Sequence, residues 1–185
     1  MTRYVAFLRG INVSGQKLIK MEELKKHFMM PGLQNIVTYI QSGNVLFDSE
    51  EKKAELLRDN IEQQLAKQLG YTVPAILRSL PEIKKVIKNN PFDTPVAGEK
   101  VKLYVYFLSS VHAPGLKDTL EAFSNELEQV RVVGREVYLL TGSYGSTRFP
   151  NTFIEKKHTE YIHNGQQSRR FRPSMSPFLQ IFQPQ

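Results

Sequence analysis

The stretch YVAFL at residues 4–8 returns almost unchanged as YVYFL at residues 104–108. Both copies are rich in the β-branched and aromatic residues that favour strands, and both are apolar throughout instead of alternating with polar residues. Continuous apolar strands are typical of sheets that are covered on both faces. The repeat therefore predicts one sheet in each half of the chain, and we expect the other half of the molecule to provide the second cover.

The first copy opens a series of elements that the hydrophobic periodicity places within residues 3–78. The expected elements are a strand at 4–8, a helix at 22–30, strands at 35–40 and 44–47, a helix at about 51–69 that ends at Gly70, and a strand at 72–77. This β-α-β-β-α-β order is that of the ferredoxin-like fold. Ser79 and Glu82 then have the spacing of a capping box, which predicts a short helix after the last strand.

The second copy opens the same series again. The expected elements are a strand at 101–109, a helix marked by Leu116, Leu120 and Phe123, a hairpin of strands 129–133 and 136–140, and a helix at about 151–162. We therefore predict an α+β fold of two ferredoxin-like halves that are related by internal duplication. The predicted domains are 1–88 and 101–165, joined through a loop at 89–100 and followed by an atypical tail at 166–185.

The composition of the 185 residues fits a globular protein with a sizeable core, since 41% are hydrophobic and 23% are charged. The chain has no apolar run of the length that a membrane span requires, and Arg9 interrupts the apolar N-terminal stretch, which favours a strand over a signal peptide. The absence of cysteine excludes disulfides, thiolate metal sites and cysteine nucleophiles. We therefore expect a cytoplasmic protein.

The net charge of +7 makes this a basic protein and raises nucleic acid as a partner. However, residues 156–172 alone hold two Lys, three Arg and one Glu, which is more than half of that excess. Base stacking on the first sheet would need Tyr4, Phe7 and Phe47, and residues 44–49 lack the basic-glycine-aromatic signature of RNA-binding sheets. We therefore interpret these aromatic residues as core.

Several segments of the sequence point to a family. They are FLRGINVSG at 7–15, KMEEL at 20–24, TYIQSGNVLF at 38–47, NPF at 90–92 and VVGREVYL at 132–139. In this order they resemble the bacterial domain-of-unknown-function family 1697, from the start of the chain to about Lys157. The resemblance implies a two-subdomain α+β fold and no established activity, cofactor or catalytic residue. Similar proteins continue after a segment like NTFIEKK with an arginine-asparagine-tryptophan stretch that is absent here, so a reading-frame change near Lys157 and natural divergence both stay open.

The predicted topology brings the end of strand 4–8 to the same sheet edge as the turn between strands 35–40 and 44–47, because neighbouring strands run antiparallel. A guanidinium, backbone amides and the start of the helix at 22–30 would together suit a small anionic or phosphorylated ligand. The alternative is that these Asn, Gly and Ser residues are ordinary turn residues and that Arg9 pairs with a carboxylate. The candidate ligand-binding residues are Arg9, Gly10, Asn12, Lys17, Gln41, Ser42 and Asn44.

Other sequence patterns add one candidate binding site and argue against several other kinds of site. Gly134 and Arg135 form the corresponding hairpin tip of the second half, although a Gly-Arg turn needs only backbone freedom. The GSYGS loop at 142–146 lacks the spacings of phosphate-binding glycine loops. His158 and His163 turn away from each other on a helix, and no paired carboxylates or nucleophile motif stand out. We expect no metal and no cofactor, and the sequence leaves open whether the protein is an enzyme.

The leading hypothesis is thus an uncharacterised cytoplasmic protein that binds a small anionic ligand at a sheet edge near Arg9. One alternative is a nucleic-acid-binding module that uses the basic surface. The other is a protein-interaction module in which an exposed sheet edge pairs with a partner strand. The sequence indicates neither the identity of the ligand nor the oligomeric state.

Overall fold

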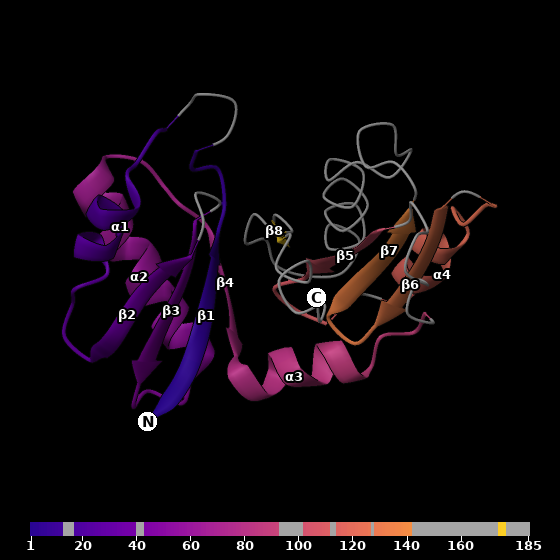
Figure 1. The fold of residues 1–185 in the computed structure, drawn as a ribbon, viewed down its shortest axis with the longest axis horizontal. Helices are drawn as coiled ribbons and strands as arrows, with labels where there is room; N and C mark the ends of the chain where they lie inside the picture. The colour runs from indigo at the N-terminus through magenta and orange to yellow at the C-terminus, as the bar shows by residue number, and fades with distance from the viewer. Residues whose placement is uncertain are drawn as a thin grey trace. The chain divides into compact units, whose positions relative to one another are not determined.

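The structure is a computed structural model that describes residues 1–12, 17–39, 43–92, 102–111, 114–126, 128–141 and 174–176. The chain divides into two compact units, Met1–Lys85 and Val86–Gln185, and each unit holds one sheet. The described residues form two four-stranded antiparallel sheets and four helices, so the fold is mixed α+β, as predicted (Figure 1). None of the described helices has the length and apolarity that a bilayer crossing requires.

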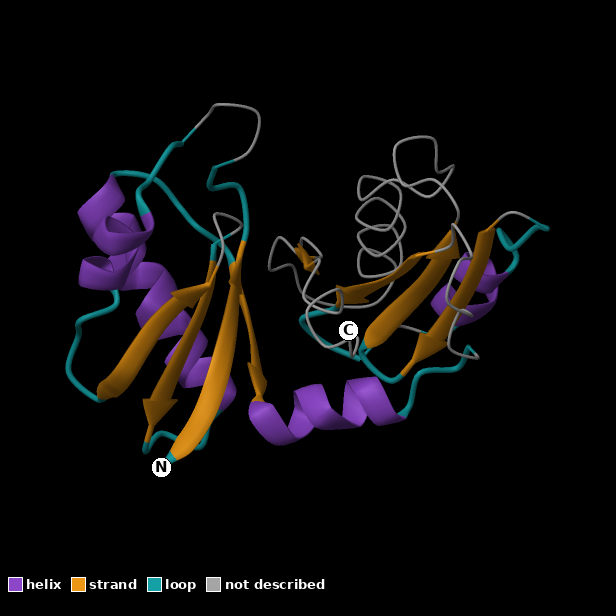
Figure 2. Cartoon of the chain, in the orientation of Figure 1, coloured by secondary structure: helices purple, strands orange, loops and turns teal. Residues whose placement is uncertain are grey.

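The first unit contains the elements that the periodicity predicts for residues 3–78, in the predicted order. They are β1 (Thr2–Leu8), α1 (Met21–His27), β2 (Leu33–Tyr39), β3 (Asn44–Ser49), α2 (Ala54–Leu69) and β4 (Ala75–Ser79), and α3 (Leu80–Lys88) follows at once. The sheet order is β2-β3-β1-β4, so β1 lies between two partners and β2 and β4 form the edges. Both α1 and α2 cover the same face of this sheet (Figure 2).

The core of the first unit lies between the sheet and these two helices. Tyr4 of β1 faces the helices and stacks on Phe47 of β3, with the two ring centroids 5.9 Å apart. The next residues along β1 alternate in direction, so Val5 and Phe7 point to the opposite face of the sheet, where they are fully buried as well. Strand β1 is therefore buried on both faces, as its continuous apolar sequence predicts.

Two helix ends confirm the capping signals of the sequence. Gly70 ends α2 in the left-handed conformation, with a φ of 75°, and its N–H donates to the carbonyl of Ala66. At the start of α3, the backbone N–H of Ser79 donates to the Glu82 carboxylate at 2.7 Å, and the N–H of Glu82 donates back to Ser79 Oγ at 3.4 Å. This reciprocal pair is the predicted capping box.

Several element boundaries differ from the prediction, such as the end of α1 at His27 and not at residue 30, and two of these differences have a clear physical cause. Helix α2 begins at Ala54 and not near residue 51, because the Glu51 carboxylate accepts the backbone N–H of Lys53 at 2.7 Å and holds a turn ahead of the helix. Strand β4 begins at Ala75 and not at residue 72, because its pairing with β1 begins where Ala75 lies opposite Leu8. Tertiary pairing thus overrides the β propensity of the preceding residues.

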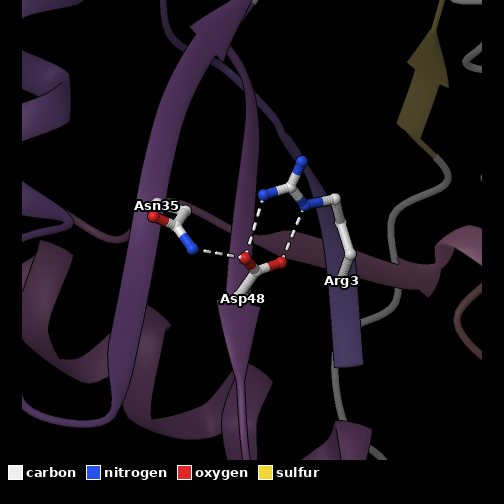
Figure 3. Close-up of polar contacts among 3 residues, drawn as sticks. All are labelled: Arg3, Asn35 and Asp48. Carbon is white, nitrogen blue, oxygen red and sulfur yellow. Dashed lines mark hydrogen bonds and ion pairs between the residues drawn. The ribbon is translucent and has the colours of Figure 1, made fainter. Parts of the chain in front are cut away.

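A bulge in the edge strand β2 is held by a cluster of polar side chains (Figure 3). The register of β2 against β3 shifts between Gln34 and Val37, and Asn35 within the bulge has a φ of 50°. The Asn35 side-chain amide donates to the Asp48 carboxylate at 2.7 Å. Arg3 of β1 donates to the same carboxylate from Nε at 2.7 Å and from a terminal nitrogen at 2.9 Å. The cluster ties three neighbouring strands together around the bulge.

The second unit repeats the arrangement of strands. Its elements are β5 (Lys102–Phe107), α4 (Leu116–Glu121), β6 (Glu128–Val133), β7 (Glu136–Thr141) and β8 (Ser174–Ser176), and the sheet order is β6-β7-β5-β8. The core packs Leu116 and Leu120 of α4 against alternate residues of β5. On the opposite face, the buried Tyr138 hydroxyl donates to the carbonyl of Val86 at 2.9 Å. This burial, with the nearby Glu136 carboxylate, raises the pKa of Tyr138.

Some predictions for the second half differ from the structure. Helix α4 ends at Glu121, so Phe123, expected on the buried face of a helix, lies in the following turn and is 42% exposed. Strand β8 forms within the predicted tail at 166–185 and pairs with β5. The predicted helix at 151–162 and most of the predicted loop at 89–100 lie outside the described residues. The predicted domain boundaries stay predictions.

Candidate ligand-binding rim of the first unit

The candidate site is a rim at one end of the first sheet, which we define as the segments 9–12 and 17–20 of the β1–α1 connection with Gly43 and Pro74. Two backbone hydrogen bonds build it. The N–H of Leu8 donates to the carbonyl of Gly43 at 3.2 Å, and the N–H of Arg9 donates to the carbonyl of Pro74 at 2.9 Å. The loop that follows β1 therefore meets the residues that precede β3, which is the juxtaposition that the antiparallel topology predicts.

Close packing fixes this contact. Gly43 has a φ of 80°, and a Cβ atom placed on it would lie 2.5 Å from Cδ1 of Ile11. Ile11 and Ile19 are both buried and belong to the core of the first unit. The apolar side chains of the loop thus anchor it to the core, and glycine is needed at position 43 both for its backbone conformation and for the space.

Asn12 organises the β1–α1 connection. Its side-chain oxygen accepts the N–H of Ile19 at 2.8 Å, its side-chain nitrogen donates to the carbonyl of Ile19 at 3.1 Å, and its backbone N–H donates to the carbonyl of Lys17 at 3.2 Å. The left-handed backbone of Asn12, with a φ of 53°, suits this residue type. These contacts give Asn12 a positioning role in the loop, and its predicted role in ligand binding stays a prediction.

The rim is positively charged. Arg9 is half-buried, and Lys17 and Lys20 are exposed. The Lys17 ammonium lies 4.5 Å from the centroid of the Tyr71 ring, a cation–π contact that favours one placement of this long side chain. No acidic residue precedes Glu22 in the sequence, but the Glu62 carboxylate accepts the N–H of Ala75, next to Pro74 of the rim, at 2.8 Å. Because α1 has only seven residues and Lys20 provides no side-chain cap, we assign the start of this helix no part in the site.

The other predicted residues are placed as follows. Gly10 is exposed with a φ of 73°, and no atom lies within 4 Å of the position of a Cβ on it. Asn44 lies opposite Phe7 in β3, so its side chain points to the sheet face away from α1 and α2, where it is 2% exposed. Gln41 and Ser42 lie outside the described residues. The structure thus brings Arg9, Gly10, Asn12 and Lys17 together in one loop and places Asn44 in the sheet.

The hairpin tip of the second unit has the same backbone contact but different chemistry. The N–H of Leu108 donates to the carbonyl of Arg135 at 2.8 Å, which matches the bond from Leu8 to Gly43. The Glu136 carboxylate accepts the N–H of Arg135 at 3.2 Å and lies 3.7 Å from a Cβ placed on Gly134. A carboxylate at this tip opposes the binding of an anion, so Gly134 and Arg135 are the less suitable of the two predicted sites.

Sequence reasoning missed Tyr71 and Pro74, which shape the rim from the segment before β4. Tyr71 follows the Gly70 cap, and nothing in its local pattern indicates a contact with Lys17. Within the described ranges, no cluster of three His, Asp or Glu side chains is arranged to hold a metal ion. The rim can therefore provide cationic side chains and a fixed backbone, which suit the recognition of an anion.

Comparison with known proteins relates this arrangement to others. The chain is similar to the solved structure of a conserved bacterial protein from Streptococcus pneumoniae, with 23% sequence identity over 97% of this chain and 96% of that chain and a TM-score of 0.61. At this identity the likeness shows a shared fold. No curated protein matches the chain. Residues 1–138 match the family described as Protein of unknown function (DUF1697), the family that the sequence motifs resemble. The chain therefore belongs to the DUF1697 family.

Proposed function

We propose that the first unit binds a small anionic or phosphorylated ligand at the rim. The observation that carries the proposal is that Arg9, Lys17 and Lys20 all stand in the β1–α1 connection, whose segments 9–12 and 17–20 are joined by a backbone hydrogen bond and begin with a bond from Arg9 to the sheet. Ammonium and guanidinium groups donate strong charge-assisted hydrogen bonds to phosphate or carboxylate oxygens. A chain without cysteine suits a reducing compartment, so we place this binding in the cytoplasm.

Preorganisation supports this reading of the loop. The two bonds between the Asn12 side chain and Ile19 close the loop, and the Tyr71 ring restrains Lys17. A ligand therefore meets cations on segments 9–12 and 17–20 that are already held by these contacts, which reduces the entropy lost on binding. The burial of Ile11 and Ile19 beneath the loop favours the same order.

The test uses inorganic phosphate, pyrophosphate and a nucleoside diphosphate as probes, with affinity measured by calorimetry on the full chain. We expect binding of at least one probe, and a dissociation constant raised about tenfold in each of Arg9→Ala and Lys17→Ala, equivalent to about 1.4 kcal/mol. The control is Lys52→Ala, since Lys52 is an exposed lysine beyond the far end of β3. Affinities that are equal in all three variants, or no binding of any probe, would reject the proposal.

The nucleic-acid alternative loses its structural basis in the described residues. Tyr4 and Phe47 stack on each other within the core, and Phe7 is buried on the opposite face of the sheet. Rings that are buried in this way offer no face to a base. The sequence interpretation of these three aromatic residues as core is therefore confirmed.

We also infer that the two units are copies of one ferredoxin-like design. The support is the shared strand order, β2-β3-β1-β4 and β6-β7-β5-β8, and a shared register, in which Tyr4 lies opposite Phe47 and Tyr104 opposite Leu139. The inference requires a helix between β7 and β8 on the sheet face that α4 covers. An experimental structure that shows residues 151–162 as a strand, or as a helix on the other face, would contradict it.

A further inference from the structure

The edge strand β6 of the second sheet is closed by side chains. Along an antiparallel strand, successive residues direct their N–H and C=O groups to opposite sides. The bond from Leu108 to Arg135 shows that the odd-numbered residues of β7 direct their backbone groups toward β5, so the even-numbered ones direct them toward β6. The outward-facing residues of β6 are Glu128, Val130 and Val132. Their N–H groups donate to Asn125 Oδ1 at 3.0 Å, to Ser124 Oγ at 3.0 Å and to Glu121 Oε1 at 2.8 Å, respectively.

The edge strand β4 of the first sheet is closed by the same means. The outward N–H of Ala75 donates to Glu62 Oε1 at 2.8 Å, and that of Ser79 donates to Glu82 Oε2 at 2.7 Å. Between them, the outward carbonyl of Leu77 accepts a bond from the Arg78 guanidinium at 3.0 Å. Satisfied edge groups of this kind cannot pair with another strand, which is a common protection of sheet edges.

Among the residues that the structure describes, the edge strand β2 lacks this protection. The bond from Leu8 to Gly43 shows that the odd-numbered residues of β3 direct their backbone groups toward β1 and the even-numbered ones toward β2. Val37 and Tyr39, which lie opposite even-numbered residues, therefore direct their groups toward β3, and Thr38 directs its groups outward. In the described parts of the chain, no side chain bonds to the outward groups of Thr38. The side chain of Val37 is 53% exposed. Residues 33–39 also contain none of the charged residues or prolines that usually guard an open edge.

The helix beside β2 has a charge pattern that is complementary to that of the same helix in a second copy of the chain. Helix α1 packs on β2, whereas α2 packs on β4, so α1 is the helix next to the open edge. Its first turn carries Glu22 and Glu23, and its last turn carries Lys25 and Lys26, all exposed. If two copies met through antiparallel β2 strands, a twofold axis would set their α1 helices antiparallel on one face. The acidic end of each helix would then approach the basic end of the other.

We propose that β2 is a self-association edge, at which two copies of this chain pair their β2 strands antiparallel and join their sheets into one. The uncharged strand places no like charges opposite each other, and the charges of α1 attract across the axis. The regular part of the edge begins after the bulge that Asn35 and Asp48 hold. Pairing therefore centres on Val37 or Thr38, so that one of these two residues lies opposite the same residue of the second copy.

The first test measures the oligomeric state of the full chain by sedimentation over a range of concentrations. We expect a dimer that dissociates on dilution, and a dissociation constant raised at least about tenfold in Val37→Lys, because the axis sets the two new charges close together. The control is Gln129→Lys, which adds the same charge to the exposed face of the closed strand β6. A wild-type protein that is monomeric at every concentration, or a dimer that Gln129→Lys disrupts and Val37→Lys does not, overturns the proposal.

The second test uses the absence of cysteine in the sequence, so that a single introduced cysteine reports on one position. Under mild oxidation we expect a disulfide-linked dimer of Val37→Cys or of Thr38→Cys, because a disulfide needs Cα atoms within about 7 Å. Gln129→Cys is the control and should stay monomeric under the same conditions. Cross-linking that is equal at all three positions would show random collision and would overturn the proposal. The result is independent of ligand binding at the rim.

Discussion

Strands β2 and β6 occupy the same place in their sheets, yet one edge is open and the other is closed. The difference comes from the segment between the first helix and the edge strand of each unit. In the second unit, Ser124 and Asn125 turn back onto β6 and bond to its outward N–H groups. In the first unit, the chain enters β2 through a bulge at Asn35, and no side chain among the described residues bonds to the outward backbone groups of Thr38. The two sheets therefore share a strand order, while their short connecting segments determine whether the edge strand can pair with another chain.

The hairpin tips of the two units differ in the same way. Both accept an N–H from the end of the neighbouring strand, at Gly43 in the first unit and at Arg135 in the second. Gly43 packs against a buried residue of a basic loop, whereas Gly134 is exposed beside the Glu136 carboxylate. One backbone contact thus supports a packed, cationic rim in one unit and an open, charge-balanced tip in the other.

The largest expected difference is between alanine substitutions at these two glycines. Gly43→Ala should lower the free energy of unfolding by about 3 kcal/mol, because it adds left-handed backbone strain and forces a Cβ into Ile11. Gly134→Ala should cost only about 1 kcal/mol, because it adds the strain alone, with the nearest atom at 3.7 Å. Urea denaturation of both variants measures the difference.

A double variant separates the two causes at Gly43. Ile11→Val removes Cδ1, the atom nearest to the added Cβ. Added to Gly43→Ala, it should recover part of the loss, whereas Ile11→Val alone should cost about 1 kcal/mol. Costs that simply add would show that the contact with Ile11 does not matter.

The next expected effect concerns the closed edge. Ser124→Ala removes the bond that the hydroxyl accepts from the N–H of Val130 at 3.0 Å and the bond that it donates to the Val130 carbonyl at 3.3 Å. The unfolding free energy should fall by about 1–2 kcal/mol, and the exposed β6 groups should promote association at high concentration. Ser110→Ala, at an exposed serine, is the matched control and should change the stability by less than about 0.5 kcal/mol. Light scattering that stays unchanged in Ser124→Ala would show that this hydroxyl does not guard the edge.

A smaller effect is expected at the rim. Tyr71→Leu keeps an apolar side chain but removes the ring over which Lys17 lies, a contact worth about 0.5–1 kcal/mol at such a site. We expect the affinity for the anionic probe to fall by a few fold, with no change in Tyr71→Phe, which keeps the ring. In a double-mutant cycle, Tyr71→Leu should have no further effect in Lys17→Ala. Independent effects of the two substitutions would contradict the positioning role of Tyr71.

The sequence predicts the elements of the first unit because local signals agree with the final packing. The apolar run at 4–8, the Gly70 cap and the pair Ser79 and Glu82 act within a few residues, and each is found in the structure. The predicted hairpin around Gly134 and Arg135 is present for the same reason. Periodicity and capping report on short-range geometry, which tertiary contacts here reinforce.

The features that the sequence does not reveal depend on distant contacts. Strand β8 is a short segment without β propensity, and it exists through pairing with β5. The bond from Glu121 to Val132 and the contact of Lys17 with Tyr71 join residues that no local pattern relates. Asn12 shows the same limit within a predicted site, since its residue type suits both a ligand contact and a loop closure, and nothing in the local pattern indicates its bond to Ile19.

The smallest expected effect is a pH dependence at the bulge of β2. Hydrogen bonds from Arg3 and then from Asn35 hold the pKa of Asp48 below its ordinary value of 3.8. Above that value the folded and unfolded chains both carry the charged carboxylate, and its bonds stabilise the fold in full. As the pH falls, the unfolded chain takes up a proton first, so this stabilisation is lost between pH 3.8 and the lower pKa of the folded state. Asp48→Asn should be slightly less stable than wild type at neutral pH and should lose less stability on acidification. The measurement is the urea midpoint of both proteins well above and well below pH 3.8, and parallel losses in the two proteins would show that Asp48 does not hold the bulge.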